Sequence, residues 1–415
     1  MKRISVIVLF MCTLSLRAQD KPHRLIELGF DAGASIANSY LIMKDILRET
    51  VTLDLSQMDD LYDGFSVLFN AHGKAFINVN LGVSWGFGLF AGADAMGQFK
   101  IPQSMVELLA RGNDLNKSYS DDLGLGAAAF LETGFWTSLK FRRIKFTVQP
   151  AYYVPLAYLG KPTVHYSFCA GEDGTISVHG KYKAELYTPI SLGDAGSLDI
   201  GSILSKDSLD IGNILSKGGI DISLRAEYPL YYNLILGGTI THIPFFPAQL
   251  SDKYSISGSF GFPDKDGKDG KDKKNIIDII NGKEDAPELI MNPPEKGNGN
   301  KIVLRPLKVG VDAVYRPFRL RLLAVKPNLA LVFNSIYDIP VYADFGLTGE
   351  LNLADIFILG VGTRYEDLVW KQRANLVLNF RVIELGIGIS TQSQQFLKSF
   401  QGAGLGVDVG FRMGF

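Results

Sequence analysis

The last eleven residues, L-G-V-D-V-G-F-R-M-G-F, constrain the fold of this chain more than any other stretch. From Leu405 to Phe415 the odd-numbered positions are all apolar, whereas the even-numbered ones are glycine, Asp408 and Arg412. Successive side chains of a β-strand point to opposite faces, so this segment predicts a strand with one apolar and one polar face. Such a strand fits a sheet packed on a core or a sheet that faces lipid.

The strand closes on an aromatic residue, with no polar tail behind it. In this it resembles the C-terminal signal of bacterial outer-membrane β-barrels, which the barrel-assembly machinery reads. The resemblance assigns the role of assembly signal to Phe411, Met413 and Phe415. It implies a location in the outer membrane of a diderm bacterium, in contact with the lipids there.

The beginning of the chain has the layout of a signal peptide. Lys2 and Arg3 precede a short apolar run at residues 4–16, and Ala18 offers a cleavage point. The run is too short to span a bilayer. We expect residues 1–18 to be removed on export and residues 19–415 to form one barrel domain. Cys12 admits lipidation as an alternative, although large residues precede it.

Composition excludes several classes of protein. The chain has 42 basic and 43 acidic residues and a net charge of −1, which argues against a nucleic-acid partner. After the leader no run of 18 apolar residues appears, which argues against membrane-spanning helices. Cys169 would be the only cysteine left, so no intramolecular disulfide is expected. The 44 glycines and the 11 % aromatic residues are typical of a barrel.

Period-two alternation returns along most of the chain and is clearest from residue 303 onward. Residues 101–111 instead have helical spacing, and residues 41–63 suggest one or two helical turns. Short corners are predicted near residues 85–86, 138–140, 231–232, 316–319, 353–355 and 382–384. Longer connections are predicted at residues 37–73, 100–121, 155–162, 188–218, 244–301, 335–340, 367–373 and 394–403.

Outer-membrane barrels have short turns on the periplasmic side and long loops outside. The alternation of connection lengths therefore predicts an all-β fold, a transmembrane antiparallel up-and-down barrel with short loop or lumen helices. We count sixteen strands, or fourteen if the hairpin at residues 164–187 stands outside the wall. Aromatic residues fall at the predicted strand ends: Trp85, Trp136, Tyr231, Tyr232, Tyr315 and Phe318 at corners, and Tyr337, Tyr365 and Trp370 at the opposite ends.

Two segments of the predicted extracellular loops have an unusual composition. Residues 197–206 recur as residues 208–217, a duplication that fits either a tolerant loop or a small apolar ligand patch. Residues 264–274, D-K-D-G-K-D-G-K-D-K-K, predict a mobile loop. A calcium loop is the alternative, but lysines interrupt its acidic positions and no glutamate closes it.

The polar faces of the strands carry charges of both signs. The candidate lumen-lining residues are Asp312, Asp344, Glu350, Arg364, Arg381, Glu384, Asp408 and Arg412. They are expected to form a structural charge network or a permeation path. For Asp408 and Arg412 the partners are predicted on the penultimate strand, residues 384–390, and on the first strand, residues 25–36.

These features predict an outer-membrane channel or transporter for small molecules. The size, the strand number and the short amphipathic helices are similar to the FadL family of long-chain fatty-acid transporters, which implies hydrophobic solutes such as fatty acids. The Asn-Pro-Ala stretch of that family's N-terminal hatch is missing, and Asn292-Pro293 lies late in the chain, so no binding residues are carried over. The alternative is a surface adhesin or structural barrel that acts through its loops.

An enzyme would need clustered catalytic groups. Of the five histidines only His165 and His179 are expected to be cross-strand neighbours, with Glu172 and Asp173 in the turn between them. We interpret them as loop histidines and predict no enzymatic activity, no cofactor and no metal. The sequence leaves the oligomeric state open.

Overall fold

The computed structural model describes residues 24–40, 64–81, 84–189, 211–261, 274–275, 279, 288–293, 295–317 and 322–415. Five predictions concern segments outside these residues, wholly or in large part. They are the signal peptide, the helical turns at 41–63, the first copy of the duplication, the polar run at 264–274 and the corner aromatic Phe318.

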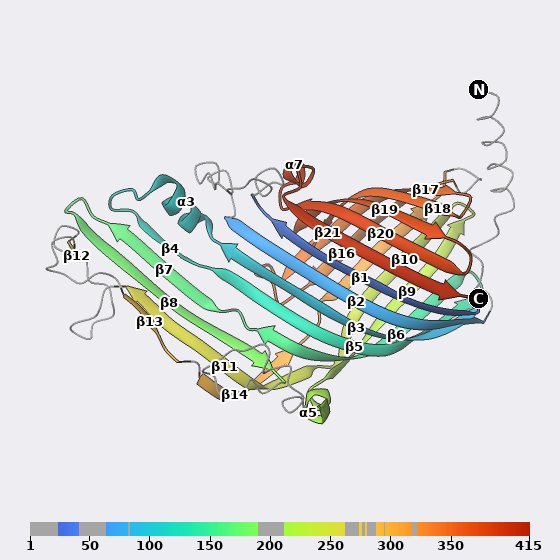
Figure 1. Cartoon of the computed structure of the whole chain (residues 1–415), viewed down its shortest axis with the longest axis horizontal. Helices are drawn as coiled ribbons and strands as arrows, with labels where there is room; N and C mark the ends of the chain where they lie inside the picture. Colours follow the sequence, from blue (N-terminus) through green and yellow to red (C-terminus); the bar gives the residue numbers. More distant parts are fainter. Residues whose placement is uncertain are drawn as a thin grey trace, which may run out of the picture.

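Fourteen antiparallel strands close into a barrel (Figure 1). They are β1 (Ile26–Asn38), β2 (Phe65–Leu81), β3 (Trp85–Ile101), β5 (Gly124–Phe141), β6 (Ile144–Leu159), β9 (Gly219–Tyr231), β10 (Leu234–Phe246), β15 (Leu307–Tyr315), β16 (Leu323–Phe333), β17 (Val341–Leu353), β18 (Phe357–Glu366), β19 (Val369–Asn379), β20 (Ile383–Ser393) and β21 (Gly404–Gly414). Each pairs with the next, and β21 pairs with β1, so the ring is complete. The predicted barrel is confirmed, with the lower strand count.

The outer face of this wall is apolar. On β21 the side chains of Leu405, Val407 and Val409 are 44, 49 and 41 % exposed, and on β20 Ile387 and Ile389 are 52 and 59 % exposed. So continuous an apolar surface is unfavourable in water and suits lipid, where only a closed sheet satisfies its backbone hydrogen bonds. The alternation predicted for the last strand is confirmed.

Short connections gather at one end of the barrel, which we call the corner end. They are residues 82–84, 142–143, 232–233, 316–322, 354–356 and 380–382. The end of the chain lies there too, because Phe415 exchanges backbone hydrogen bonds of 3.2 Å with Ile26 at the start of β1 (Figure 1). The opposite end, the loop end, carries most of the longer connections. Within the barrel wall the predicted alternation of short and long connections holds at every place but one, although the segments predicted as long loops at 155–162 and 244–301 lead into or contain strands outside the wall.

The exception is the connection predicted at residues 367–373, which is only a two-residue turn. Asp367 and Leu368 join β18 to β19 with positive φ angles of 54° and 66°. Two-residue turns of this kind favour Asn-Gly or Asp-Gly, so the Asp-Leu pair in the sequence did not indicate a tight turn. Other parts of the fold hold it: the Asp367 N–H donates to the Asp344 carboxylate at 3.1 Å, and the Tyr342 hydroxyl donates to Asp367 at 3.3 Å.

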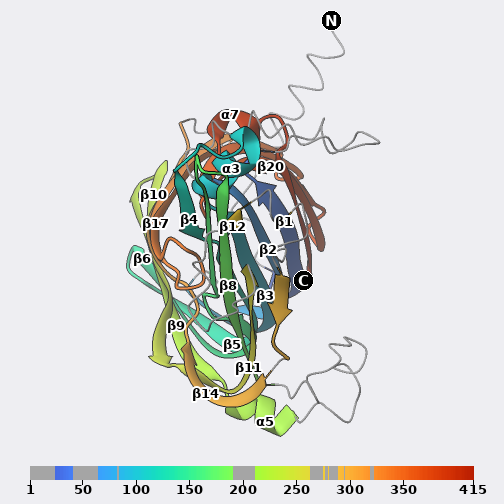
Figure 2. The ribbon, with the colours of Figure 1, turned by 90° about the vertical axis from the view of Figure 1, so that its left-hand side faces the viewer.

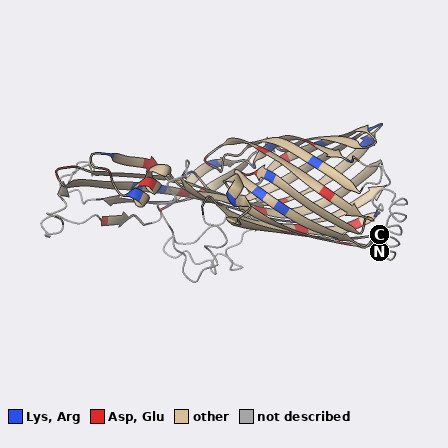
Figure 3. Cartoon of the chain, turned by 90° about the horizontal axis from the view of Figure 1, so that it is seen from above, with Lys and Arg blue, Asp and Glu red and all other residues tan. Residues whose placement is uncertain are grey.

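The same sheet continues beyond the loop end (Figure 3), and we call this part of it the extension. It consists of β4 (Ser118–Asp122), β7 (Thr163–Ala170), β8 (Thr175–Thr188), β11 (Ala248–Gly261), β12 (Lys274–Asn275), β13 (Glu288–Met291) and β14 (Glu295–Val303). Seen from the loop end, β8 and β11 stand in front of the barrel (Figure 2). Two residue pairs, Tyr158–Tyr187 and Leu159–Leu186, connect it to the wall.

The extension corrects the prediction of one long loop at residues 244–301. Much of that segment forms strands, because β11 pairs with β8 over ten residues that lie far away in sequence. The hairpin of β7 and β8 stands outside the wall, which is why the barrel has fourteen strands and not sixteen.

The described helices are short. The helix predicted at residues 101–111 is confirmed as α3 (Gln103–Arg111), which begins after Pro102 and ends at Gly112. The second copy of the duplication contributes α5 (Ile211–Ser216), and α7 (Phe396–Ser399) follows β20. None of the helices in the described ranges is long and apolar enough to cross a bilayer.

Candidate functional site

The interior of the barrel contains a row of cavities. At the corner end a cavity of about 410 Å³ is lined by residues that include Arg316, Asn352 and Asp355. Next to it lies a central cavity of about 390 Å³. The two share the side chains of Lys326, Glu350, Asn375, Val377, Glu384 and Arg412. Because one set of side chains borders both spaces, the two cavities adjoin.

The row continues toward the loop end. A third cavity, of about 250 Å³, shares His72, Arg364, Arg373 and Asp408 with the central cavity. The fourth, of about 380 Å³, shares Asn70, His72 and Asp367 with the third and reaches Asn334 and Tyr342 near the loop end. We call it the outer cavity. The four spaces together follow the barrel interior from the corners to the base of the outer loops.

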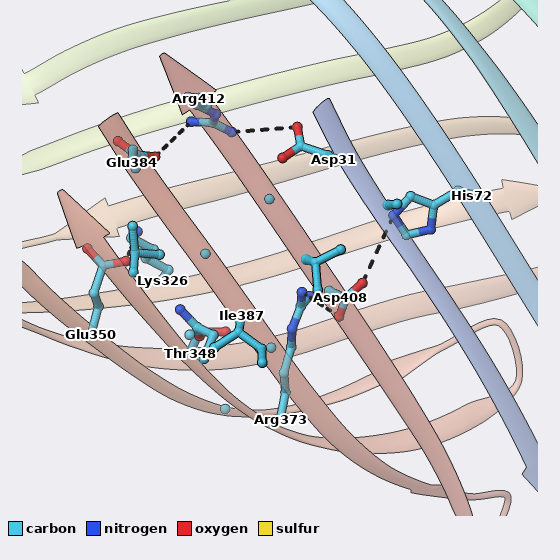
Figure 4. A pocket seen from close by; sticks show the side chains of 18 of the residues that line it. Asp31, His72, Lys326, Thr348, Glu350, Arg373, Glu384, Ile387, Asp408 and Arg412 are labelled. Atoms are coloured by element: carbon cyan, nitrogen blue, oxygen red, sulfur yellow. Dashed lines mark hydrogen bonds and ion pairs between the residues drawn. The ribbon is translucent and has the colours of Figure 1, made fainter. Parts of the chain in front are cut away.

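Two clusters of charged side chains line the central cavity, and each cluster contains charges of both signs (Figure 4). In the first, the Arg412 guanidinium lies between Glu384 on β20, at 3.3 Å, and Asp31 on β1, at 3.7 Å. Glu384 is the direct cross-strand partner of Arg412. The prediction that Arg412 finds partners on the penultimate and first strands is confirmed.

In the second cluster the partners of Asp408 are one strand further away than predicted. Its carboxylate accepts a hydrogen bond of 2.8 Å from Arg373 on β19 and lies 4.0 Å from His72 on β2. The adjacent strands place glycines opposite Asp408, namely Gly388 and Gly33. A Cβ atom on Gly33 would lie 2.5 Å from the Asp408 carboxylate. Glycine therefore leaves the space across which these long side chains meet.

Further ion pairs line the wall toward both ends. Lys326 contacts Glu350, and Lys308 binds Asp344 at 2.6 Å. Arg225 donates two hydrogen bonds of 3.0 Å to the Asp312 carboxylate. Pairs of this kind keep charged groups hydrated or partnered inside the wall.

Arg305 occupies the centre of a denser cluster beside the outer cavity. It lies in the connection between β14 and β15, and its side chain is 5 % exposed. Its guanidinium is 2.8 Å from Glu132, 3.5 Å from Asp221 and 3.6 Å from Asp94. Three strands of the wall are thereby tied to one side chain that reaches in from outside the ring.

Residues 334–340, which we call the plug segment, join β16 to β17 at the loop end, and Asn334 in this segment lines the outer cavity. Ile336 and Tyr337 in it are 2 % and 1 % exposed. The Asp338 N–H donates to Gln98 Oε1 on β3 at 3.0 Å, and the Ile336 carbonyl packs against Gly126 on β5. The segment thus folds against the wall. Tyr337 lies at the loop end, where the sequence placed it, but its side chain is buried in an apolar cluster and does not face lipid.

Most of the predicted lumen residues lie where the strands alternate inward. Five of them, Glu350, Arg364, Glu384, Asp408 and Arg412, line the central cavity, and Asp344 lines the outer one. Asp312 pairs with Arg225 as described above. Arg381 does not belong to the set. It lies exposed in the turn after β19 with φ 65°, because that strand ends two residues earlier, at Asn379.

Other interior residues were missed by sequence reasoning. Trp136 was predicted only as an aromatic residue at a corner, but its indole N–H donates to Asn78 inside the barrel at 2.9 Å. Lys74, Glu132 and Arg373 belong to the network and were not singled out. Alternation in their strands was the available signal for these three. Arg305 lies off any strand, so period two gave no signal for it.

Two of the aromatic residues predicted at the strand ends opposite the corners face outward. Tyr365 and Trp370 face outward at the loop end with ring centroids 5.2 Å apart, and Phe396 of α7 lies 4.8 Å from Trp370. This cluster matches an interfacial aromatic belt. The assembly-signal candidates also face outward, with Phe411 stacked on Phe30 of β1 at 5.9 Å and Phe415 75 % exposed.

Of the two histidines predicted as cross-strand neighbours, His165 lies in a hydrogen-bonded row on the extension. His165 Nδ1 is 3.0 Å from Asp122, and its Nε2 is 3.3 Å from the Ser120 hydroxyl. His179 is opposite Ser167 and not opposite His165. The row is exposed on the extension and lines none of the four cavities. Among the residues the structure describes, no group of His, Cys, Asp and Glu is arranged to hold a metal ion.

Several solved structures are similar to this chain over nearly its whole length. The Ralstonia pickettii toluene transporter TbuX has 8 % identity and a TM-score of 0.48, over 97 % of this chain and 92 % of that one. The P. putida toluene transporter TodX has 11 % identity and a TM-score of 0.45, over 97 % and 92 %. A Pseudomonas aeruginosa FadL homologue has 9 % identity and a TM-score of 0.45, over 94 % and 90 %. No protein-family profile and no curated protein matches the chain.

Proposed function

We propose that this barrel lies in a bacterial outer membrane and passes small molecules through its interior. The observation that carries the proposal is the row of four adjoining cavities between the corners and the plug segment. A barrel whose interior is filled by side chains would not contain such a row of cavities. Ion pairs along a hydrated path allow water inside the barrel, because each charged side chain on such a path has a partner or water.

The outer cavity favours solutes with an apolar part. Met96, Phe130, Val332 and Tyr342 contribute apolar surface to it, next to the charged cluster around Arg305. Apolar lining with a few placed polar groups is the usual character of a small-molecule site. TbuX and TodX are toluene transporters, and a small aromatic solute would fit this surface.

The plug segment is the gate in this proposal. Asn334 of this segment lines the outer cavity, and Ile336 and Tyr337 belong to the apolar cluster that contains its lining residues Phe130, Val332 and Tyr342. Movement of this segment would therefore open the row of cavities toward the loop end. Passage therefore requires a second arrangement of residues 334–340, with the barrel wall unchanged.

Planar-bilayer conductance of the purified full chain tests this. The unaltered protein should conduct weakly, and a variant with Ile336→Gly and Tyr337→Gly should conduct strongly, because it loses the buried side chains of the plug. The control is Leu397→Gly on α7, which is 74 % exposed and lies outside the interior. Equal conductance and equal liposome uptake of toluene for all three proteins would refute the proposal.

The orientation and the export route belong to the same proposal. Residues 1–18 act as a cleaved signal peptide, the corner end faces the periplasm, and Phe411, Met413 and Phe415 are read by the assembly machinery. The exposed Phe415 at the seam between β21 and β1 supports this reading. Deleting Phe415 should lower the amount assembled in cells while the purified variant still folds into vesicles. Equal assembly in cells would contradict the role of Phe415.

A second function is favoured by the extension. Its strand β13 exposes Leu289, Ile290 and Met291 at 59, 52 and 67 %, which is an apolar edge on the far side of the barrel mouth. Such an edge suits recognition of another molecule by a surface adhesin. Replacing residues 249–302 by a short turn should abolish adhesion of expressing cells but spare toluene uptake if both functions exist. Adhesion that survives the replacement would exclude the second function.

A further inference from the structure

The central cavity is lined by equal numbers of cationic side chains and carboxylates, but these do not form one-to-one ion pairs. Four cationic side chains line it, Lys326, Arg364, Arg373 and Arg412, and so do four carboxylates, Asp31, Glu350, Glu384 and Asp408. Arg412 takes two of the carboxylates, whereas Lys326 and Arg373 take one each. Within the described ranges this leaves Arg364 without a carboxylate at ion-pair distance, the nearest interacting one being Glu366.

The Arg364 side chain lies where a solute inside the barrel can reach it. Its side chain borders both the central cavity and the third cavity. Its one protein hydrogen bond there is to the Thr348 hydroxyl at 3.3 Å, and its Nε is buried without an acceptor. The neighbouring Arg373 also has a buried Nε without an acceptor. A guanidinium with five donors is therefore served by a single hydroxyl in the described structure.

The nearest acidic groups are already engaged. Glu366 is two residues further along the same strand, but it lies 3.5 Å from Lys371 and 3.8 Å from Lys308. Asp408 is held by Arg373. The wall thus offers Arg364 no free carboxylate among the described residues, although removing a guanidinium from bulk water is unfavourable unless an acceptor replaces the water.

We infer that Arg364 forms the binding site for the carboxylate group of a small organic acid on its way through the barrel. A guanidinium presents parallel N–H donors that match the two oxygens of a carboxylate. The adjoining spaces of about 390 and 250 Å³ accommodate a compact solute. The inference rests on the proposed passage of solutes and adds to it the chemical class of one of them.

Isothermal titration of the purified full chain in detergent micelles tests the site, with benzoate as the probe and benzamide as its neutral match. Benzoate should bind, and Arg364→Gln should weaken it about tenfold to a hundredfold, as expected for the loss of a charge-assisted pair. Benzamide should bind equally weakly to both proteins. The control Arg225→Gln removes an interior arginine that pairs with Asp312 and lines neither cavity, so it should leave benzoate binding unchanged.

Each alternative outcome refutes the assignment in a different way. Equal binding of benzoate and benzamide would mean that only apolar surface is recognised. Inorganic phosphate binding as tightly as benzoate would make this a general anion site. Unaltered benzoate binding by Arg364→Gln, with unchanged mobility of the folded band on gels, would remove Arg364 from the site. Toluene uptake by the unaltered protein separates the two proposals, because uptake without benzoate binding in that protein refutes only the site.

Discussion

Two adjacent residues of β20 give the sharpest test of the wall. Ile387 points outward and is 52 % exposed, whereas Gly386 lies on the inward face of the strand, between Glu384 and Gly388 of that face. Both lie near the middle of the strand, so Ile387→Arg and Gly386→Arg introduce the same charge at nearly the same depth on opposite faces. Only the face differs between the two variants.

The structure sets the magnitude expected for each. An arginine on the lipid face near the bilayer midplane costs about 2–4 kcal/mol, which lowers the folding equilibrium constant roughly 30-fold to 1000-fold. On the other face, a Cβ on Gly386 would find its nearest atom at 3.8 Å, which is ordinary van der Waals contact. The new guanidinium would reach hydrated space near Glu384, so its cost should stay below about 1 kcal/mol.

The assay is urea titration of the purified barrels folding into lipid vesicles, read as the fraction of heat-modifiable folded band on unboiled gels. Ile387→Arg should lower the unfolding free energy by the amount given, and Gly386→Arg should remain close to the unaltered protein. A larger loss for Gly386→Arg would show that the two faces are reversed. Equal losses would show that neither face meets lipid.

Three further predictions concern other parts of the molecule. Gly33→Val should cost about 1–3 kcal/mol by urea titration because its Cβ meets an ion-paired carboxylate, whereas Gly73→Val, which meets nothing within 4 Å, should be neutral. Tyr337→Ala should speed amide exchange in the plug segment roughly a hundredfold or more, measured by mass spectrometry, since it empties a buried site. Hydrogen bonds from Lys253, Tyr187 and Lys183 lower the pKa of Glu185 in the extension from 4.5 to about 2. The ionised Glu185 therefore stabilises the extension fully at pH values above its unfolded pKa, and this stabilisation is lost as pH falls from about 4.5 through 2. Pepsin should cleave the extension within that pH range, and cleavage should begin at higher pH in Lys253→Gln.

Much of the wall followed from the sequence alone. The period of two in residues 405–415 assigned each side chain to a face, because a strand permits only two directions. Pro102 and Gly112 bounded the short helix between them, since proline begins and glycine ends a helix favourably. Corner positions followed from breaks in the alternation. Even the partners of Arg412 were predictable, because a closed ring places the first strand beside the last.

What the sequence left undecided depends on contacts between distant segments. The extension forms because β11 finds β8, and no local pattern states which strands pair across a long connection. The turn at Asp367 and the burial of Tyr337 are stabilised by partners elsewhere in the ring. The same holds for the interior charges: alternation shows that Arg364 and Arg412 both face inward, but the stagger of neighbouring strands decides that one meets two carboxylates and the other none. The direction in which a side chain points depends on its own strand, whereas its ion-pair partners depend on how the strands of the closed ring are staggered. Only the tertiary structure determines these partners.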